Sequence, residues 1–178
     1  MITVDNRIVL RKPNISDIEA LYILKNDVES NASLGGFSAG YSKEDIADWI
    51  KFHNKAKNEI LYVIEDMFAE MLIGHVGFYD IDYRVRKANY GILIAHEQSR
   101  GKGFGRICTG YMVSYGFSQL NLNRIECSII SDNQASLHLV QSIGFVKEGV
   151  KRQCLYRDGK FYDAVMMAIL YEDYINEK

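Results

Sequence analysis

Apolar residues along the chain gather in short blocks separated by polar turns, and the spacing within each block indicates its secondary structure. Blocks rich in β-branched and aromatic residues, bounded by polar or glycine-containing turns, are typical of strands. Such blocks occupy Ile8–Lys12, Ile60–Ile64, Met71–Tyr79, Ala88–Ala95 and Arg124–Ile130, and two more flank the turn Asp158-Gly159. Because Asp-Gly favours a tight hairpin turn, we expect about seven strands with the last two paired.

Four other segments carry helix signals. Ser16-Asp-Ile-Glu19 has the spacing of a capping box and predicts a helix to about Asn26, and Ser42 opens a second helix. A third is expected from Arg106 to about Gln119, and a fourth between Asn133 and Gly144. The order β-α-α-β-β-β-α-β-α-β-β predicts an α/β protein whose mixed, mostly antiparallel sheet is flanked by about four helices.

Composition narrows the class of protein. The 178 residues, 48% of them hydrophobic, suit a single domain over residues 1–178. A net charge of −2 without a basic block argues against nucleic-acid binding. No apolar run is long enough for a membrane span, and the N-terminus does not resemble a signal peptide. Three widely spaced cysteines indicate reduced thiols in a cytoplasmic protein, and no histidine or cysteine spacing predicts a metal.

The most informative segment is Gln98-Ser-Arg-Gly101-Lys-Gly103-Phe-Gly105, which lies between a predicted strand and a predicted helix. Alternating glycines let backbone N–H groups converge on one point, and the helix N-terminus adds partial positive charge. A phosphate is the expected ligand. The glycine spacing fits neither a Walker loop nor the dinucleotide fingerprint.

The segment resembles the Gln/Arg-x-x-Gly-x-Gly/Ala motif of the GNAT N-acetyltransferase superfamily. Asn133-Gln-Ala-Ser136 and Gly144-Phe145 are similar to a second motif of that superfamily. Leu122–Glu126 and the tail from Glu148 to Asp163 look like the RimJ/RimL-type subgroup. The resemblance covers about residues 72–170, and it implies a single GNAT-like domain that transfers acetyl groups from acetyl-CoA to amines.

The resemblance also implies which residues bind acetyl-CoA. The strand before the glycine loop should separate from its neighbour at Leu93–Ala95, so that the pantetheine arm pairs there as an added strand. Asn133 and Ser136 would lie near the thiol end of the arm. The expected cofactor-binding residues are Ile92, Leu93, Ile94, Gln98, Ser99, Arg100, Gly101, Lys102, Gly103, Phe104, Gly105, Arg106, Asn133 and Ser136.

The sequence does not single out one general acid for the thiolate or one general base for the amine. Many members of the superfamily carry a tyrosine seven residues after the asparagine, as general acid to the thiolate. Here Val140 stands at that position, so Ser136, a water molecule or another tyrosine must replace it. Glu126 is a charged residue within an apolar strand; it could act through water as general base, or Arg124 or a lysine could simply satisfy it.

Histidines and cysteines are weaker candidates. We interpret His75 as a core residue, His96 as a strand-end residue, and His53 and His138 as helix-surface residues. Cys108 and Cys127 are expected to be buried and inert, because direct attack on the thioester needs no protein nucleophile.

The acceptor is expected to be a small-molecule or peptide amine: a protein N-terminus, a polyamine or an amino sugar. Loop Asn31–Ser42, the charged turn Asp80–Lys87 and the tail hairpin should surround it, with acidic residues available for a cation. The basic residues Arg84, Arg86 and Lys87 would suit a nucleotide sugar. A non-catalytic acyl-CoA sensor is the alternative, because the usual tyrosine is missing. Sheet edges and Ala164–Leu170 could support a homodimer.

Overall fold

The computed structural model describes residues 1–28, 30, 40–95 and 97–176. Its elements follow one another along the chain as β1 (Ile2–Thr3), β2 (Ile8–Arg11), η1 (Ile15–Asp17), α1 (Ile18–Asn26), α3 (Lys43–Lys55), β3 (Ile60–Asp66), β4 (Met71–Asp82), β5 (Lys87–Ile94), η2 (Glu97–Ser99), α4 (Phe104–Ser118), β6 (Arg124–Ile130), α5 (Gln134–Gln141), β7 (Val146–Arg157), β8 (Lys160–Leu170) and α6 (Tyr171–Asn176). The predicted α/β class is confirmed, and every predicted strand and helix has a counterpart in the structure.

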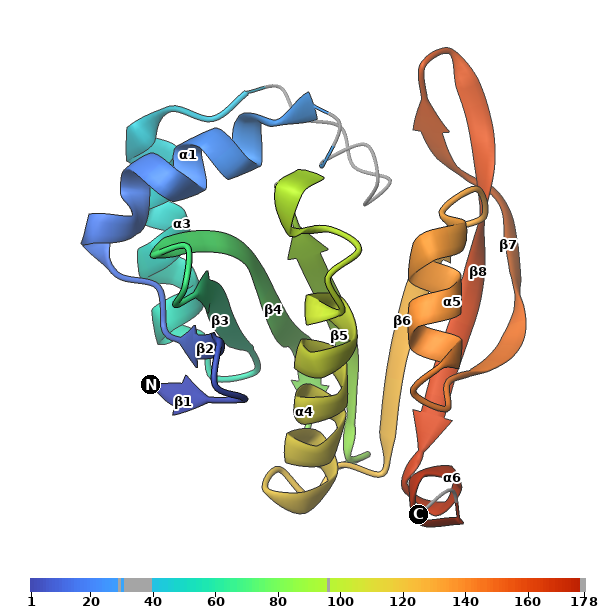
Figure 1. The fold of residues 1–178 in the computed structure, drawn as a ribbon. Helices are drawn as coiled ribbons and strands as arrows, with labels where there is room; N and C mark the ends of the chain where they lie inside the picture. Colours follow the sequence, from blue (N-terminus) through green and yellow to red (C-terminus); the bar gives the residue numbers. More distant parts are fainter. Residues whose placement is uncertain (29, 31–39, 96, 177–178) are drawn as a thin grey trace.

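One eight-stranded sheet organises the fold, with the strand order β1-β2-β3-β4-β5-β6-β8-β7. All neighbouring strands are antiparallel except β5 and β6, which are parallel. Helices α1 and α3 cover one face of the sheet, and α4 and α5 cover the other (Figure 1). A parallel pair needs a crossover connection, and α4 supplies it here.

Each face of the sheet has its own apolar core. On the α4 and α5 face, the fully buried side chains include Phe78 and Met112. On the α1 and α3 face, Leu21 and Ile46 pack against strand residues such as Val63 and Leu93. This two-layer burial explains the near-continuous apolar runs that predicted the central strands.

Capping residues mark helix starts as the sequence suggested. Asn14 and Asp17 form a capping box before η1 and α1, two residues earlier than the predicted Ser16. Ser42 and Asp45 form the expected box at α3. None of the helices among the described residues has the length and hydrophobicity that a membrane span requires.

Several boundaries differ from the predictions. The short β1 and α6 were not expected, because neither has enough residues for a visible period. Strand β4 runs on to Asp82, so the expected charged turn Asp80–Lys87 shrinks to residues 83–86. Of the expected loop Asn31–Ser42, residues 31–39 lie outside the described residues, as do Glu29 and His96.

Candidate active site

The site forms where two parallel strands separate. Strand β5 pairs with β6 only from Lys87 to Asn89, opposite Arg124 to Glu126. From Tyr90 onward β5 has no β6 partner, and the two ribbons diverge towards the glycine loop (Figure 1). The expected separation is therefore confirmed, although it begins near Asn89 rather than at Leu93. Such a free strand edge leaves backbone groups available to an extended ligand.

A cavity of about 400 Å³, here called the large cavity, opens beside this free edge. Twelve of the fourteen residues expected to bind the cofactor line it. The two that do not are Gln98 and Lys102, which are both exposed. Ala135 and Leu139 of α5 also line it and were not expected. The large cavity thus joins the strand edge, the glycine loop and the start of α5.

The glycine loop has the backbone geometry of an anion cradle. Gly101 and Gly103 have φ of +72° and +81°, and Gly103 is the N-cap of α4 without a capping side chain. A Cβ atom at either glycine would meet nothing within 4 Å, so space lies open beside the loop. Uncapped N–H groups at a helix start attract an anion. These features fit the pyrophosphate of a coenzyme A thioester.

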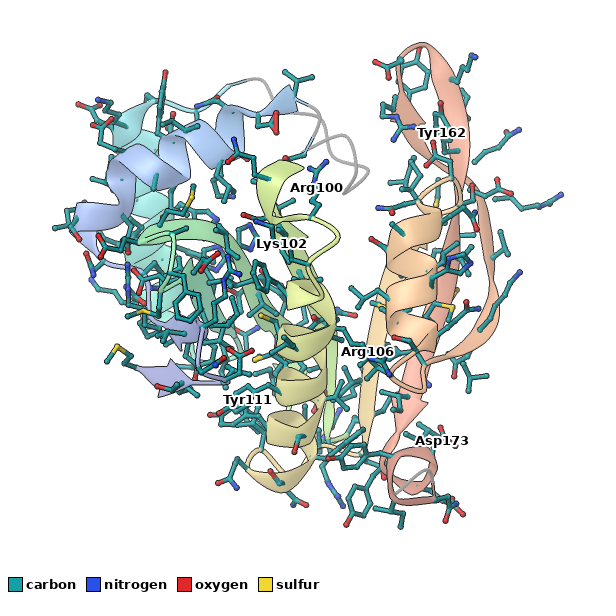
Figure 2. All side chains as sticks on the ribbon, viewed as in Figure 1. Arg100, Lys102, Arg106, Tyr111, Tyr162 and Asp173 are labelled. Carbon is teal, nitrogen blue, oxygen red and sulfur yellow. The ribbon has the colours of Figure 1, made fainter. Side chains whose placement is uncertain are left out.

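Three basic residues flank the loop, but they do not share one role. Arg100 and Lys102 belong to the glycine loop, whereas Arg106 lies between α4 and α5 in this view (Figure 2). The Arg100 guanidinium donates to the Ile94 carbonyl at 3.1 Å and to Ser30 Oγ at 3.0 Å. Arg100 therefore ties the loop to the end of β5, while the exposed Lys102 and Arg106 can meet an anion directly.

A second cavity of about 70 Å³, here called the small cavity, lies between β5, β6 and α5. The two cavities are adjacent, because four residues line both: Ile92, Asn133, Ser136 and Leu139. Asn133 accepts a hydrogen bond from the Ser136 N–H at 3.0 Å and is the N-cap of α5. The predicted pair thus meets at the junction of the cavities, with Asn133 also serving helix capping.

Val140 lies in the wall of the small cavity and is only 3% exposed. The tyrosine in the same wall is Tyr90, whose hydroxyl is 2.7 Å from Thr109 Oγ1. Thr109 in turn donates to the Gly105 carbonyl at 2.6 Å. Burial raises the pKa of Tyr90 well above its ordinary value, and the hydrogen bond with Thr109 only partly opposes this. Tyr90 is therefore held neutral and directed towards α4.

Glu126 lies at the last β5–β6 pair, opposite Asn89, where the strands separate. It accepts hydrogen bonds from Arg124 Nε at 2.7 Å and Lys87 Nζ at 3.3 Å. Burial opposes its ionisation, but these two cations outweigh burial and lower the pKa of Glu126. The carboxylate is therefore ionised at neutral pH. It belongs to the wall of neither cavity.

The histidines occupy different places from one another. His75 is buried as predicted, and burial lowers its pKa to about 3, so it stays neutral. The prediction that His53 lies on a helix surface is wrong: it is 9% exposed, and its Nδ1 is 2.6 Å from Glu59. The helical period placed His53 correctly on α3, but only the packing of Trp49 and Tyr79 against its ring buries it.

The cysteines differ in exposure, and none is disulfide-bonded. Cys108 is buried, as expected, and Cys127 is half-buried. Burial raises the pKa of both thiols to about 12. Among the residues that the structure describes, no group of three histidine, cysteine or acidic side chains is placed to hold a metal ion.

Comparison with known proteins identifies relatives across nearly the whole chain. The family model described as an acetyltransferase (GNAT) domain matches residues 7–146. The uncharacterized N-acetyltransferase YoaA of Bacillus subtilis (strain 168) is 33% identical over 167 residues, which are 93% of this chain and 94% of the relative. A spermidine N(1)-acetyltransferase of Vibrio cholerae is 30% identical over 173 residues, with 97% and 98% coverage. A crystal structure of spermidine N-acetyltransferase from Vibrio cholerae, in complex with CoA and spermine, superposes with a TM-score of 0.88 at 27% identity, covering 97% of this chain and all of the other.

Proposed function

Because the chain belongs to the GNAT acetyltransferase family and is an N-acetyltransferase that uses acetyl-CoA, we propose that its acceptor is a primary amine of a polyamine. One observation carries the choice of acceptor: the near full-length similarity to a spermidine N(1)-acetyltransferase in both sequence and fold. The RimJ/RimL-type subgroup stays a prediction from Leu122–Glu126 and the tail.

The donor site in this proposal is the large cavity. Free N–H groups at Gly103 and the first turn of α4 hold the pyrophosphate, and Lys102 and Arg106 add positive charge. The pantetheine arm lies along the free edge of β5 beside Ile92–Ile94, which places its thiol end at Asn133 and Ser136. The support is geometric, since these residues, apart from Lys102, line one cavity of suitable size.

Acetyl-CoA supplies an activated thioester, and the chain positions the amine and manages protons. A polyamine arrives as an ammonium, which must lose a proton before its nitrogen can attack. The ionised Glu126 lies where β5 and β6 separate, and it can bind that ammonium if the substrate replaces Lys87 as its partner. Because its pKa is lowered, Glu126 is a weak base, so we assign it to ammonium binding, with the proton passing to water. Ser136 donates a hydrogen bond to the departing thiolate in place of the tyrosine absent at Val140, and the thiolate takes its proton from water.

The basic cluster that would have favoured a nucleotide sugar is largely occupied by other partners. Arg86 Nε donates to the Asn121 carbonyl at 2.7 Å, and Lys87 pairs with Glu126. An anionic acceptor therefore has little free positive charge in this cluster, which leaves the polyamine as the better-supported class.

The test is a thiol-release assay with acetyl-CoA and a panel of polyamines, peptides and amino-sugar nucleotides. We expect release with polyamines and little with the other acceptors. Glu126→Gln should lower kcat/KM for the polyamine by about tenfold or more, as expected when one charge-assisted contact is lost. Glu148→Gln is the matched control, because Glu148 also pairs with Arg124 but lies on the exposed strand β7.

The outcomes separate the hypotheses. Release with amino-sugar nucleotides alone would replace the polyamine by the anionic acceptor. Saturable acetyl-CoA binding without release for any amine would favour the sensor. Equal loss in Glu126→Gln and Glu148→Gln would place the effect in Arg124 rather than in ammonium binding.

A further inference from the structure

The small cavity is larger and more apolar than proton transfer to a thiolate requires. At about 70 Å³ it exceeds the roughly 10–15 Å³ that one water molecule needs. Five of its eleven wall residues are aliphatic, and they come from β5, β6 and α5: Ile92, Ile129, Ile130, Leu139 and Val140. A space of this kind binds an apolar group in preference to water.

The polar groups in the wall are few and leave little for a polar ligand. The Tyr90 hydroxyl is engaged with Thr109 Oγ1 at 2.7 Å, on the α4 side. Cys127 contributes a neutral thiol, because burial raises its pKa to about 12. The remaining polar side chains are Ser128 of β6 and the pair Asn133 and Ser136, which also lines the large cavity. The rest of the wall is apolar and is therefore suited to a hydrocarbon chain.

The direction of the donor leads into this space. An arm lying along β5 from Ile94 towards Ile92 continues towards Gly91 and Tyr90, which both wall the small cavity. The acyl group at the end of that arm is the first part of the donor to reach it. This step rests on the donor site given under Proposed function, but not on the identity of the acceptor.

We propose that the small cavity is an acyl-chain pocket and that the protein transfers acyl groups of three and four carbons, from propionyl-CoA and butyryl-CoA, as well as acetyl. Val140 sets its depth, because its short side chain forms part of the wall while a ring at the same position would fill the space. The reaction is unchanged in type. The amine nitrogen bonds to the acyl carbonyl carbon, the C–S bond breaks, and free coenzyme A and an N-acyl amine result.

The test compares acetyl-, propionyl- and butyryl-CoA by kcat/KM with one acceptor, and by equilibrium binding without any acceptor. We expect the wild-type protein to use propionyl-CoA and butyryl-CoA within about tenfold of acetyl-CoA, because a pocket that fits an added methylene does not reject it. Val140→Phe should lower the butyryl-to-acetyl ratio by about tenfold or more, since one methylene of misfit costs that much or more. Val140→Ala should raise the same ratio.

Controls keep the outcome decisive. Val85→Phe adds the same ring in the exposed turn between β4 and β5 and should leave the ratio as in wild type. If Val140→Phe does not fold, Val140→Leu provides a smaller obstruction that should act in the same direction. The pocket assignment is overturned if wild type rejects butyryl-CoA more than about 200-fold, or if the ratio is the same in all Val140 variants. Binding measurements still report on the pocket when no polyamine is acylated, so the two proposals fail separately.

Discussion

Replacing Gly103 provides the sharpest test of the anion cradle. Gly103 is the N-cap of α4, has φ of +81° and faces open space within 4 Å. Gly103→Glu adds a carboxylate where we place the pyrophosphate, whereas Gly103→Ala adds only a methyl group. Gly159, in the turn between β7 and β8, is a close structural match, with φ of +77° and the same open surroundings.

The magnitudes follow from geometry and charge. A side chain in the left-handed region costs roughly 1–2 kcal/mol, which lowers Tm by about 2–4 °C per kcal/mol for a chain of this size. Substitutions at Gly103 and Gly159 should therefore destabilise the fold similarly. A carboxylate within about 5 Å of a phosphate charge costs about 1–3 kcal/mol at an effective dielectric constant between 80 and 20. That corresponds to roughly 5- to 150-fold in Kd for acetyl-CoA.

Isothermal titration calorimetry with acetyl-CoA measures the affinity, and differential scanning fluorimetry measures Tm. We expect Gly103→Glu to weaken binding within that range, Gly103→Ala to weaken it much less, and Gly159→Glu to leave it unchanged. The effect should shrink at high salt, because screening shortens the range of the added charge. An unchanged Kd in Gly103→Glu, with a lowered Tm showing that the side chain is in place, would refute the cradle.

Three further predictions concern stability and binding. Gly116→Ala should destabilise the fold by about 1–3 kcal/mol in chemical denaturation, because its Cβ would lie 2.9 Å from the buried Phe78 ring. The hydrogen bonds from Arg7 lower the pKa of Asp66, so they stabilise the folded state above pH 3.8, and this stabilisation is lost as pH falls through the lowered pKa. Asp66→Asn should remove this part of the acid dependence of Tm. An unchanged pH profile of Tm in this variant would contradict the prediction. Gly105→Ala should weaken acetyl-CoA binding, since its Cβ would lie 3.2 Å from Leu139 in the wall of the large cavity; equal affinity by calorimetry would count against that wall.

Local sequence patterns predicted the helices and strands well, because burial period and capping residues act within each element. Apolar runs such as Met71–Tyr79 are long enough to show that a strand is buried on both faces, and Ser42 identified the start of α3 through its own capping geometry. Boundaries were less accurate, since β4 extends through Asp82 into polar residues that carry no strand signal. The burial of His53 was missed because it depends on side chains from α3 and β4 that only packing brings together.

In the candidate site, too, some residues could be predicted from local sequence and others could not. The glycine loop could be recognised from the sequence because Gly101 and Gly103 have positive φ, a conformation that favours glycine. Ala135 and Leu139 carry no such sequence signal, although they lie four residues apart on α5, next to the predicted Ser136. Arg100 was predicted as a cofactor contact, but its bonds to Ile94 and Ser30 depend on the tertiary position of Ser30.

The sequence by itself determined a phosphate-binding loop, because alternating glycines between a strand and a helix are a local requirement of such a loop, and its resemblance to the GNAT motifs identified acetyl-CoA as the donor. The sequence also determined the order of strands and helices, because the spacing of apolar residues within each segment indicates its secondary structure. Only the tertiary structure decided how far β5 and β6 stay paired, which cations pair with Glu126, and that Val140 lies in the wall of the small cavity. These properties depend on residues that are distant in the chain and meet only when the sheet forms.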